Sequence, residues 1–313
     1  MSNKKKFIIT IDNEEDNQWN PESEETTENA KFLIRFQELC NRFDFKPVYL
    51  TTYHMARDPV FADFAKTALQ KNQCEIGMHL HAWSTPPEYD LQKTSNERSY
   101  LIEYPLDIME EKICTLHNTL TSTFGEMVSH RSGRWALNQE YLALLIKYGY
   151  RCDCSVTPGV NWGAKLGATG IPGSDYSREQ NGAYEIMDGM LEVPVSIHKI
   201  RYFDVGDIKT PKAFAKEISH LLRGKSTWMR PSFTSVYRME KLLDYVKGTN
   251  SDYIMFMLHS SELMPGGSPY YKDELAIEQL YEQMEQLFAY ASRDFEGITL
   301  RDYVDKKQRK LFN

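Results

Sequence analysis

Two histidines, His79 and His81, alternate within one short apolar segment, Glu75–Trp83. If this segment is a strand, both side chains point to the same face of the sheet, about 7 Å apart at the backbone. A second apolar segment, Phe7–Ile11, runs directly into Asp12-Asn13-Glu14. Two imidazoles and one carboxylate from these segments would form a mononuclear site for zinc or a similar divalent ion.

The elements that must position these residues follow an alternation of apolar and amphipathic segments, which predicts parallel strands joined by helices. We expect strands at 7–12, 47–52, 75–82, 127–131, 151–156, 191–197 and 253–259, and a short terminal strand at 297–300. We expect helices at 26–43, 58–71, 106–124, 138–148, 211–223, 235–247 and 273–293. The prediction is therefore an α/β fold, a (β/α) barrel of about seven strands that need not be complete.

The residues that could do chemistry fall at predicted strand ends, where functional residues of such barrels lie. These candidates are Asp12, Glu14, His79, His81, His130, Arg131, Asp153 and His259. Residues 157–188 are rich in Gly, Asn, Ser and Tyr and are too long for a plain connection. We expect them to form an inserted loop, either a lid over the substrate or a poorly ordered segment, within a single domain spanning 1–313.

The composition and net charge exclude some classes of protein. The chain has 313 residues, of which 41% are hydrophobic and 26% charged, and its net charge of −7 argues against nucleic acid or an anionic membrane as the main partner. No apolar run approaches the ~20 residues that span a bilayer, and the apolar run after the basic start is too short for a signal peptide. We therefore expect a cytoplasmic protein with reduced cysteines, and the sequence leaves the oligomeric state open.

Five short motifs occur in an order that resembles the NodB-type polysaccharide deacetylases, carbohydrate esterase family four. They are Thr10–Glu14, Glu75–His79, His130–Trp135, Asp153–Ser155 and Met257–His259, and they span residues 7 to 260. Members of that family have a distorted (β/α) barrel and use a divalent metal to remove acyl groups from N-acylated sugars. The resemblance implies a metal-dependent hydrolase acting on an N-acylated carbohydrate, with zinc as the expected ion and cobalt, nickel or iron as alternatives.

Two of the motifs depart from the usual family pattern. Asn13 stands where the first motif normally has its second Asp, so the resemblance to branches with Asp-x-Glu assigns Glu14 to the metal and Asp12 to the catalytic base. The exchange of these two roles stays open. Trp83 takes the place of the second histidine of the usual His-x-x-x-His motif, but His79 and His81 on a strand still present both rings to one face.

The resemblance also gives roles to the remaining candidates. Asp12 would accept a proton from water, Arg131 would keep Asp12 ionised and in line, and His259 would donate a proton to the departing nitrogen. Flat apolar surfaces for a sugar ring are expected from the aromatic side chains of Trp83, Trp135, Trp162, Tyr270 and Tyr271, and Asp153 is expected to bind substrate as well.

Other interpretations of the same residues remain. The altered motifs are also compatible with a metal-independent C–N hydrolase on the same barrel, and a non-catalytic carbohydrate-binding protein is a third hypothesis. For single residues the simpler expectations are a helix cap or solvated acidic loop for Asp12 and Glu14, a structural role for His130, and a surface position for Glu75.

Overall fold

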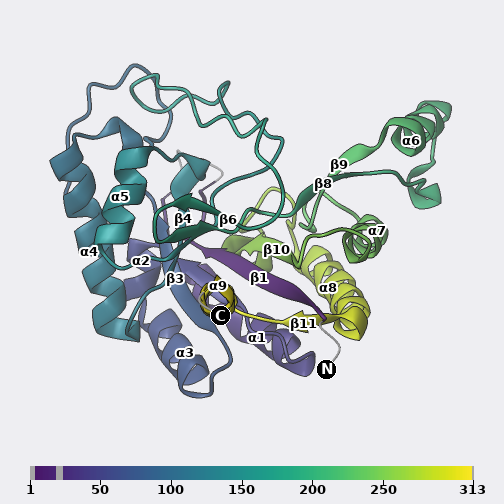
Figure 1. Cartoon of the computed structure of the whole chain (residues 1–313), viewed down its shortest axis with the longest axis horizontal. Helices are drawn as coiled ribbons and strands as arrows, with labels where there is room; N and C mark the ends of the chain where they lie inside the picture. Colours follow the sequence, from purple (N-terminus) through teal and green to yellow (C-terminus); the bar gives the residue numbers. More distant parts are fainter. Residues whose placement is uncertain (1–3, 19–23, 312–313) are drawn as a thin grey trace.

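The computed structural model describes residues 4–18 and 24–311 and shows a curled, open sheet with helices around its outer face (Figure 1). Within the described residues, seven strands run parallel in the order β10-β1-β2-β3-β4-β5-β7. These strands are β1 (Lys5–Asn13), β2 (Val48–Thr51), β3 (Glu75–Leu80), β4 (Ser129–Ser132), β5 (Cys152–Asp153), β7 (Met190–Glu192) and β10 (Tyr253–His259). The predicted barrel-like α/β fold of about seven parallel strands is therefore confirmed.

Further strands extend this arrangement. β6 (Tyr184–Met187) pairs antiparallel with β7, and β11 (Phe295–Gly297) pairs with β1. A separate hairpin is formed by β8 (Ile197–Ile200) and β9 (Lys225–Trp228). The helices are α1 (Leu33–Arg42), α2 (Tyr53–Arg57), α3 (Pro59–Gln70), α4 (Leu106–Phe124), α5 (Gln139–Lys147), α6 (Pro211–Arg223), α7 (Val236–Lys247), α8 (Glu274–Asp294) and α9 (Leu300–Leu311).

Strand β1 is buried on both faces of the sheet, as a central parallel strand must be. Phe7, Ile9 and Ile11 pack in the core between the sheet and the outer helices. Ile8 points to the inner face, where it joins a second core with residues of the C-terminal helix α9 such as Val304. The apolar part of β1 is held in the core, and its polar end begins at Asp12. This packing fixes the position of Asp12 and of Glu14, which follows the strand.

The expected strand at 191–197 is wrong, because the segment is divided between two sheets. β7 ends at Glu192, and β8 begins at Ile197 in the hairpin with β9. Pro194 lies between them, and its missing N–H prevents a regular ladder from continuing through this segment. The terminal strand expected at 297–300 is found as β11 at 295–297, and helix α9 follows it without having been predicted.

The surface position expected for Glu75 is also wrong. Its side chain is buried at 4% exposure, where it accepts hydrogen bonds from the Ser129 hydroxyl (2.7 Å) and the Arg301 backbone N–H (2.8 Å). Burial raises the pKa of this carboxyl group. Glu75 thus connects the start of β3 to the start of helix α9, at the end of the sheet opposite the polar strand ends.

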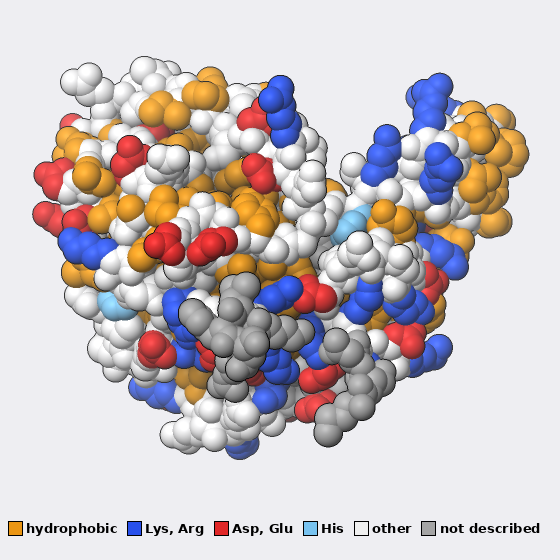
Figure 2. All heavy atoms as spheres, viewed as in Figure 1, with side chains coloured by type: hydrophobic (Ala, Val, Ile, Leu, Met, Phe, Trp, Pro, Cys, Tyr) orange, Lys and Arg blue, Asp and Glu red, His pale blue; other side chains and the backbone are white. Residues whose placement is uncertain are grey.

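Two segments lie outside the barrel-like body. The inserted loop after β5 carries isolated bridges between Asn161 and Asp175 and between Leu166 and Pro172, and β6 follows it. The hairpin β8–β9 and helix α6 form an arm that stands apart from the body and leaves an open notch (Figures 1 and 2). Exposed apolar side chains at this arm are Val205, Phe214, Leu221 and Leu222.

Candidate metal centre and active site

Glu14, His79 and His81 bring one carboxylate and two imidazoles together in a buried cluster. Glu14 follows the end of β1, His79 lies in β3, and His81 follows β3. One ligand atom from each lies within 4.8 Å of the other two. The His81 Nε2 atom lies 3.1 Å from His79 Nε2 and 3.1 Å from Glu14 Oε2, and His79 Nε2 lies 3.5 Å from the same oxygen.

These separations fit a single metal ion. Ligand atoms bound to one tetrahedral zinc ion at about 2.0–2.1 Å lie about 3.3 Å apart. The tautomer of His79 fits as well, because its Nδ1 lies 3.0 Å from the Arg131 backbone carbonyl, which can only accept a hydrogen bond. The ring proton is therefore on Nδ1, and the Nε2 lone pair faces Glu14 and His81. The residues present suit a divalent ion of the zinc type.

A second acidic residue, Glu15, lies next to His81 on the side of the ring opposite Glu14. Its side chain is 1% exposed, and within the described part of the chain neither carboxylate oxygen has a partner in hydrogen-bonding geometry. Glu15 Oε2 lies 3.6 Å from His81 Nδ1, on the side of the ring away from Glu14. Metal-binding histidines commonly donate their second ring N–H to such a carboxylate, which orients the ring and raises its basicity.

The electrostatics of the cluster show that it is built to hold positive charge. Burial by itself lowers the pKa of His81, but attraction to Glu14 and Glu15 outweighs it and raises that pKa to about 9. Burial raises the pKa of Glu14, yet the surrounding imidazoles bring the net pKa well below its usual value. Glu14 and Glu15 thus remain charged although they are buried, and a divalent cation held by Glu14, His79 and His81 would offset their charge as a proton on His81 does.

Replacing Glu15→Gln should weaken zinc binding by about 10- to 100-fold, because the amide keeps the shape but loses the charge facing His81. Competition with a chromophoric chelator measures this affinity, and Glu28→Gln, on the exposed surface, is the matched control. Equal zinc affinity in Glu15→Gln and wild type would show that Glu15 does not support the cluster.

Asp12 and Arg131 form a buried ion pair beside the cluster. Arg131, in β4, is fully buried and donates from Nη1 to Asp12 Oδ1. It also donates from Nη2 to the Thr10 hydroxyl (3.0 Å) and from Nε to the Cys154 carbonyl (3.0 Å). Burial raises the pKa of Asp12, but the Arg131 guanidinium together with His79 and His259 outweighs it, and the net pKa is lowered. Asp12 therefore stays a carboxylate with a fixed orientation.

His259 lies directly opposite Asp12, because the register of the β1–β10 ladder pairs these two residues. Its Nε2 lies 3.7 Å from Asp12 Oδ2 and 3.9 Å from Glu14 Oε1. Its Nδ1 lies 2.7 Å from Arg230 Nη2, which can only donate a hydrogen bond. The same Nδ1 lies 3.3 Å from Glu262 Oε2, so this ring nitrogen has both a donor and an acceptor beside it, while Nε2 faces Asp12 and Glu14.

Two residues that the sequence did not single out hold His259 in place. Glu262 accepts a hydrogen bond from the His259 backbone N–H (2.9 Å) and pairs with Arg230 at 3.2 Å. Burial raises the pKa of Glu262, but Arg230, His259 and Ser232 together outweigh it, and the net pKa is about 2. The spacing of Glu262, three residues after His259 at a strand end, was a usable signal. Arg230 had none, because it follows β9, which was not predicted.

The predicted tryptophans lie around this centre. Trp83 stacks on the ring of His81 with a centroid distance of 4.2 Å. Trp135 lies against the Arg131 guanidinium at 5.3 Å, and its ring is nearly parallel to that of Trp162 at 6.5 Å. Arg134 and Trp135 both have left-handed backbone angles (φ of 56° and 65°), which turn the chain sharply after β4.

Asp153 and His130 lie beneath the centre rather than at its surface. Asp153 has no exposed surface, and its Oδ1 lies 2.6 Å from His130 Nδ1. The Ser155 backbone N–H donates to its Oδ2 at 3.0 Å, and the Tyr141 hydroxyl lies 2.7 Å from the other His130 nitrogen. The substrate-binding role expected for Asp153 is therefore not supported, because a residue enclosed by these partners cannot contact a substrate.

Comparison with known proteins places the fold. No protein-family model matches the sequence, and no curated protein is significantly similar to it. A Mycobacterium smegmatis protein assigned as a polysaccharide deacetylase is similar over 99% of this chain and 93% of that chain, with 12% identity and a TM-score of 0.54. The 4-alpha-glucanotransferase of Thermococcus litoralis gives the same identity and TM-score over 96% of this chain, which spans only 38% of that protein.

These similarities confirm the predicted resemblance to NodB-type polysaccharide deacetylases at the level of the fold. At 12% identity, these structural similarities show a shared fold and do not establish a shared activity. None of the helices within 4–18 and 24–311 combines the length and apolarity needed to cross a membrane.

Proposed function

We propose that this protein is a metal-dependent hydrolase that removes an acyl group, acetyl or formyl, from an N-acylated amino sugar in a polysaccharide, a glycolipid or one of their precursors. The observation that carries the proposal is the meeting of the Glu14, His79 and His81 cluster with Asp12 and His259 at one buried edge of the sheet. A divalent ion held by Glu14, His79 and His81 would polarise the acyl carbonyl and lower the pKa of a nearby water.

The chain's own residues supply the proton transfers. Asp12, kept ionised by Arg131, accepts the proton of the attacking water. His259, as the imidazolium, donates its Nε2 proton to the departing nitrogen and is left as the neutral ring; this Nε2 lies 3.7 Å from Asp12 Oδ2. Trp83 and Trp135 are proposed to face the sugar ring, because each has a partly exposed aromatic surface next to these groups.

The same fold occurs in a glucanotransferase, so the side chains must decide between hydrolysis of an amide and chemistry at a glycosidic bond. Glycosidic cleavage generally uses two carboxyl groups, one of which has a raised pKa and donates a proton. Here the pKa values of both Asp12 and Glu14 are lowered. Neither carboxyl group has the environment of such an acid, and the two imidazoles that converge on the Glu14 carboxylate favour the metal-dependent amide hydrolase.

Elemental analysis of the purified protein, together with release of acetate or formate from N-acylated sugars, tests the proposal. We expect about one zinc, cobalt, nickel or iron per chain, because three ligands of this type define one site. His79→Ala and Glu14→Ala should lose both the metal and the activity, whereas His117→Ala in helix α4 should keep both.

Two outcomes would contradict the proposal. Protein that stays metal-free after reconstitution but still hydrolyses an amide would establish the metal-independent hydrolase. Carbohydrate binding without turnover, unchanged in Asp12→Asn and His259→Ala, would establish a non-catalytic binding protein.

A further inference from the structure

Helix α6 of the arm turns an apolar face toward the solvent. Phe214, Leu221 and Leu222 are 48%, 45% and 66% exposed, and their spacing along the helix places them on one side of it. Figure 2 shows hydrophobic side chains gathered at the outer end of the arm, beside Lys and Arg side chains. A helix on the surface of a globular protein normally buries such a face, so its exposure indicates an interaction surface.

The side of α6 that faces the body is polar. Its buried residues are Glu217 and His220. Glu217 accepts hydrogen bonds from Arg238 Nη2 at 3.0 Å and from the Asp204 backbone N–H at 2.9 Å, and its Oε1 lies 2.8 Å from His220 Nδ1. A rotation that turned the apolar face inward would break these contacts and leave buried charges unpaired, which is costly. The contacts therefore hold the apolar face outward.

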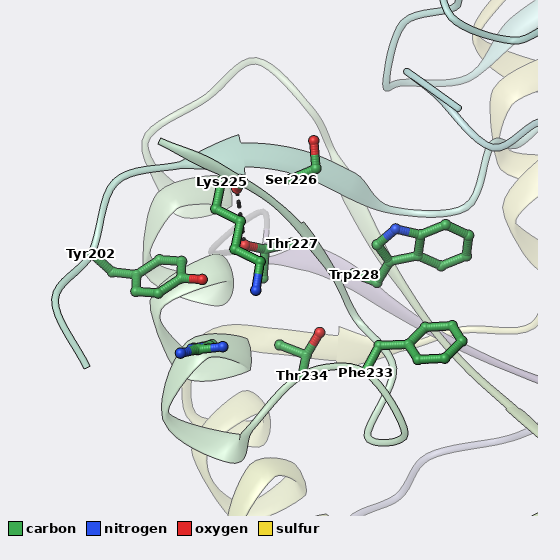
Figure 3. A pocket seen from close by; sticks show the side chains of 8 residues that line it. Tyr202, Lys225, Ser226, Thr227, Trp228, Phe233 and Thr234 are labelled. Carbon is green, nitrogen blue, oxygen red and sulfur yellow. Dashed lines mark hydrogen bonds between the residues drawn. The ribbon is translucent and has the colours of Figure 1, made fainter. Parts of the chain in front are cut away.

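The base of the arm joins the body close to the active site. Figure 3 shows Tyr202 and Thr227 beside the start of helix α7, where the Arg238 guanidinium lies 5.1 Å from the centre of the Tyr202 ring. Arg230 lies two residues after the end of β9, and its Nη2 lies 2.7 Å from His259 Nδ1. The arm is thus continuous with the segment that holds His259 in place.

The arm is basic, although the whole chain is acidic. Residues 197–228 contain seven Lys or Arg and three Asp or Glu, a net charge of +4 in a chain whose total is −7. Two of the three acids, Asp204 and Glu217, are buried against Arg238. Six of the cations are exposed, namely Lys199, Arg201, Lys209, Lys212, Lys216 and Arg223. The overall charge averages over this basic segment and does not describe the surface of the arm.

These six cations differ from cations on the surface of the body. Arg35 in helix α1, for example, pairs with Glu278 at 2.6 Å. None of the six forms an ion pair with a side chain that the structure describes. Lys212, Lys216 and Arg223 lie along one side of α6, next to its apolar face. Exposed Phe and Leu side chains flanked by Lys and Arg are typical of a helix that lies in the surface of an anionic bilayer.

A second copy of the chain would complement this surface less well. Two arms that paired about a two-fold axis would bring the cations of one copy against those of the other, and like charges repel. A bilayer with anionic phospholipids offers an apolar interior and negatively charged headgroups side by side. It therefore matches both the apolar face and the cations next to it.

We propose that the arm docks this protein onto a membrane surface that contains anionic phospholipids. Phe214, Leu221 and Leu222 enter the boundary between headgroups and acyl chains, to a depth of about 5–10 Å, and the neighbouring Lys and Arg side chains contact the phosphate groups. This interaction is independent of the proposed function, because it uses no residue of the metal centre.

Co-sedimentation of the full chain with phospholipid vesicles tests the proposal. Vesicles of phosphatidylcholine with about 30% phosphatidylglycerol are compared with vesicles of phosphatidylcholine alone. We expect binding to the anionic vesicles to be at least about tenfold tighter at low salt, since each cation near the anionic surface adds to the affinity. This preference should shrink as salt rises toward about 1 M, because the charges are then screened.

Two apolar side chains test the insertion into the bilayer. The double variant Phe214→Ala with Leu222→Ala should bind the anionic vesicles at least about tenfold more weakly, because less apolar area leaves water. Leu106→Ala with Leu275→Ala is the matched control and should bind as wild type. These leucines are 55% and 67% exposed, but they lie on helices α4 and α8 of the body.

Two lysines test the electrostatic part of the interaction. Lys212→Glu with Lys216→Glu should remove most of the preference for anionic vesicles, because it reverses two charges next to the apolar face. Lys66→Glu with Lys93→Glu makes the same change in net charge at exposed positions of the body and should keep the preference. Thermal unfolding of each variant checks that the fold is retained.

The outcomes separate this inference from other partners and from the proposed function. No binding to anionic vesicles at low salt, or equal binding by wild type and both arm variants, would overturn it. A dimer seen by sedimentation velocity without vesicles, and lost in Phe214→Ala with Leu222→Ala, would also overturn it, because a second copy would then cover the face. Vesicle binding that both arm variants lose would support it whether or not any acyl group is released.

Discussion

Asp12→Asn should lower kcat by about 10²- to 10⁴-fold while the protein stays folded and keeps its metal. The amide has the same shape as the carboxylate and can still accept a hydrogen bond from Arg131, but it cannot take a proton from water. Steady-state kinetics together with the metal content of the same preparation make the measurement. Asp63→Asn, on the exposed side of helix α3, is the control and should behave as wild type.

The metal content of this variant also decides between two assignments that the sequence left open. If Asp12→Asn loses the metal and Glu14→Gln keeps it, the two residues have exchanged roles, and Asp12 is the ligand. A variant with the metal and with wild-type kcat would show that Asp12 takes no part in the chemistry.

Arg131→Met should destabilise the protein by about 3–5 kcal/mol, the usual cost of removing one partner of a buried ion pair. The change leaves the Asp12 carboxylate buried without its main counter-charge, and it removes the donors to Thr10 and to the Cys154 carbonyl. Urea unfolding at neutral pH measures the loss. Arg57→Met, on the exposed surface, should change the free energy of unfolding by less than about 0.5 kcal/mol.

The double variant Arg131→Met with Asp12→Asn should recover part of this stability, because the unpaired charge is then gone. The pH dependence has a defined sign. The pKa of Asp12 is lowered by folding, so the stability that its ion pair contributes is present above about pH 4 and is lost as the pH falls through the folded-state pKa. The difference between wild type and Arg131→Met should therefore shrink in acid. A constant difference would contradict the assignment of the ion pair.

The periodicity of the sequence was sufficient to predict those strands and helices that follow a regular alternation of apolar and polar residues. The two-residue period of a strand placed His79 and His81 on one face, and the alternation of strands and helices predicted parallel strands in a barrel-like fold. The position of Glu14 could be predicted in the same way, because it follows the carboxyl end of a buried strand, where functional residues of such folds lie.

The residues that escaped prediction depend on contacts between distant segments. Glu15 faces His81 only because the chain turns after β1, and Arg230 reaches His259 from an arm whose strands the sequence pattern did not reveal. Glu75 and Asp153 are charged residues that the fold encloses with partners from elsewhere in the chain. Charge alone predicts exposure, and only the tertiary structure shows where a partner offsets the cost of burial.

The pairing of β1 has a consequence for how this protein is made. One edge of β1 pairs with β10, and the other edge pairs with β11 along Lys5–Phe7 and with β2 along Thr10–Asn13; β10 and β11 come from the last quarter of the chain. The Glu14 backbone N–H, for example, donates to Ser260, 246 residues later in the sequence. Phe7–Ile11 is synthesised long before β10, so the backbone groups on that edge of β1 remain unpaired until the end of the chain has been made. These long-range contacts favour slow folding, and the active site can be completed only after the last strands have been synthesised.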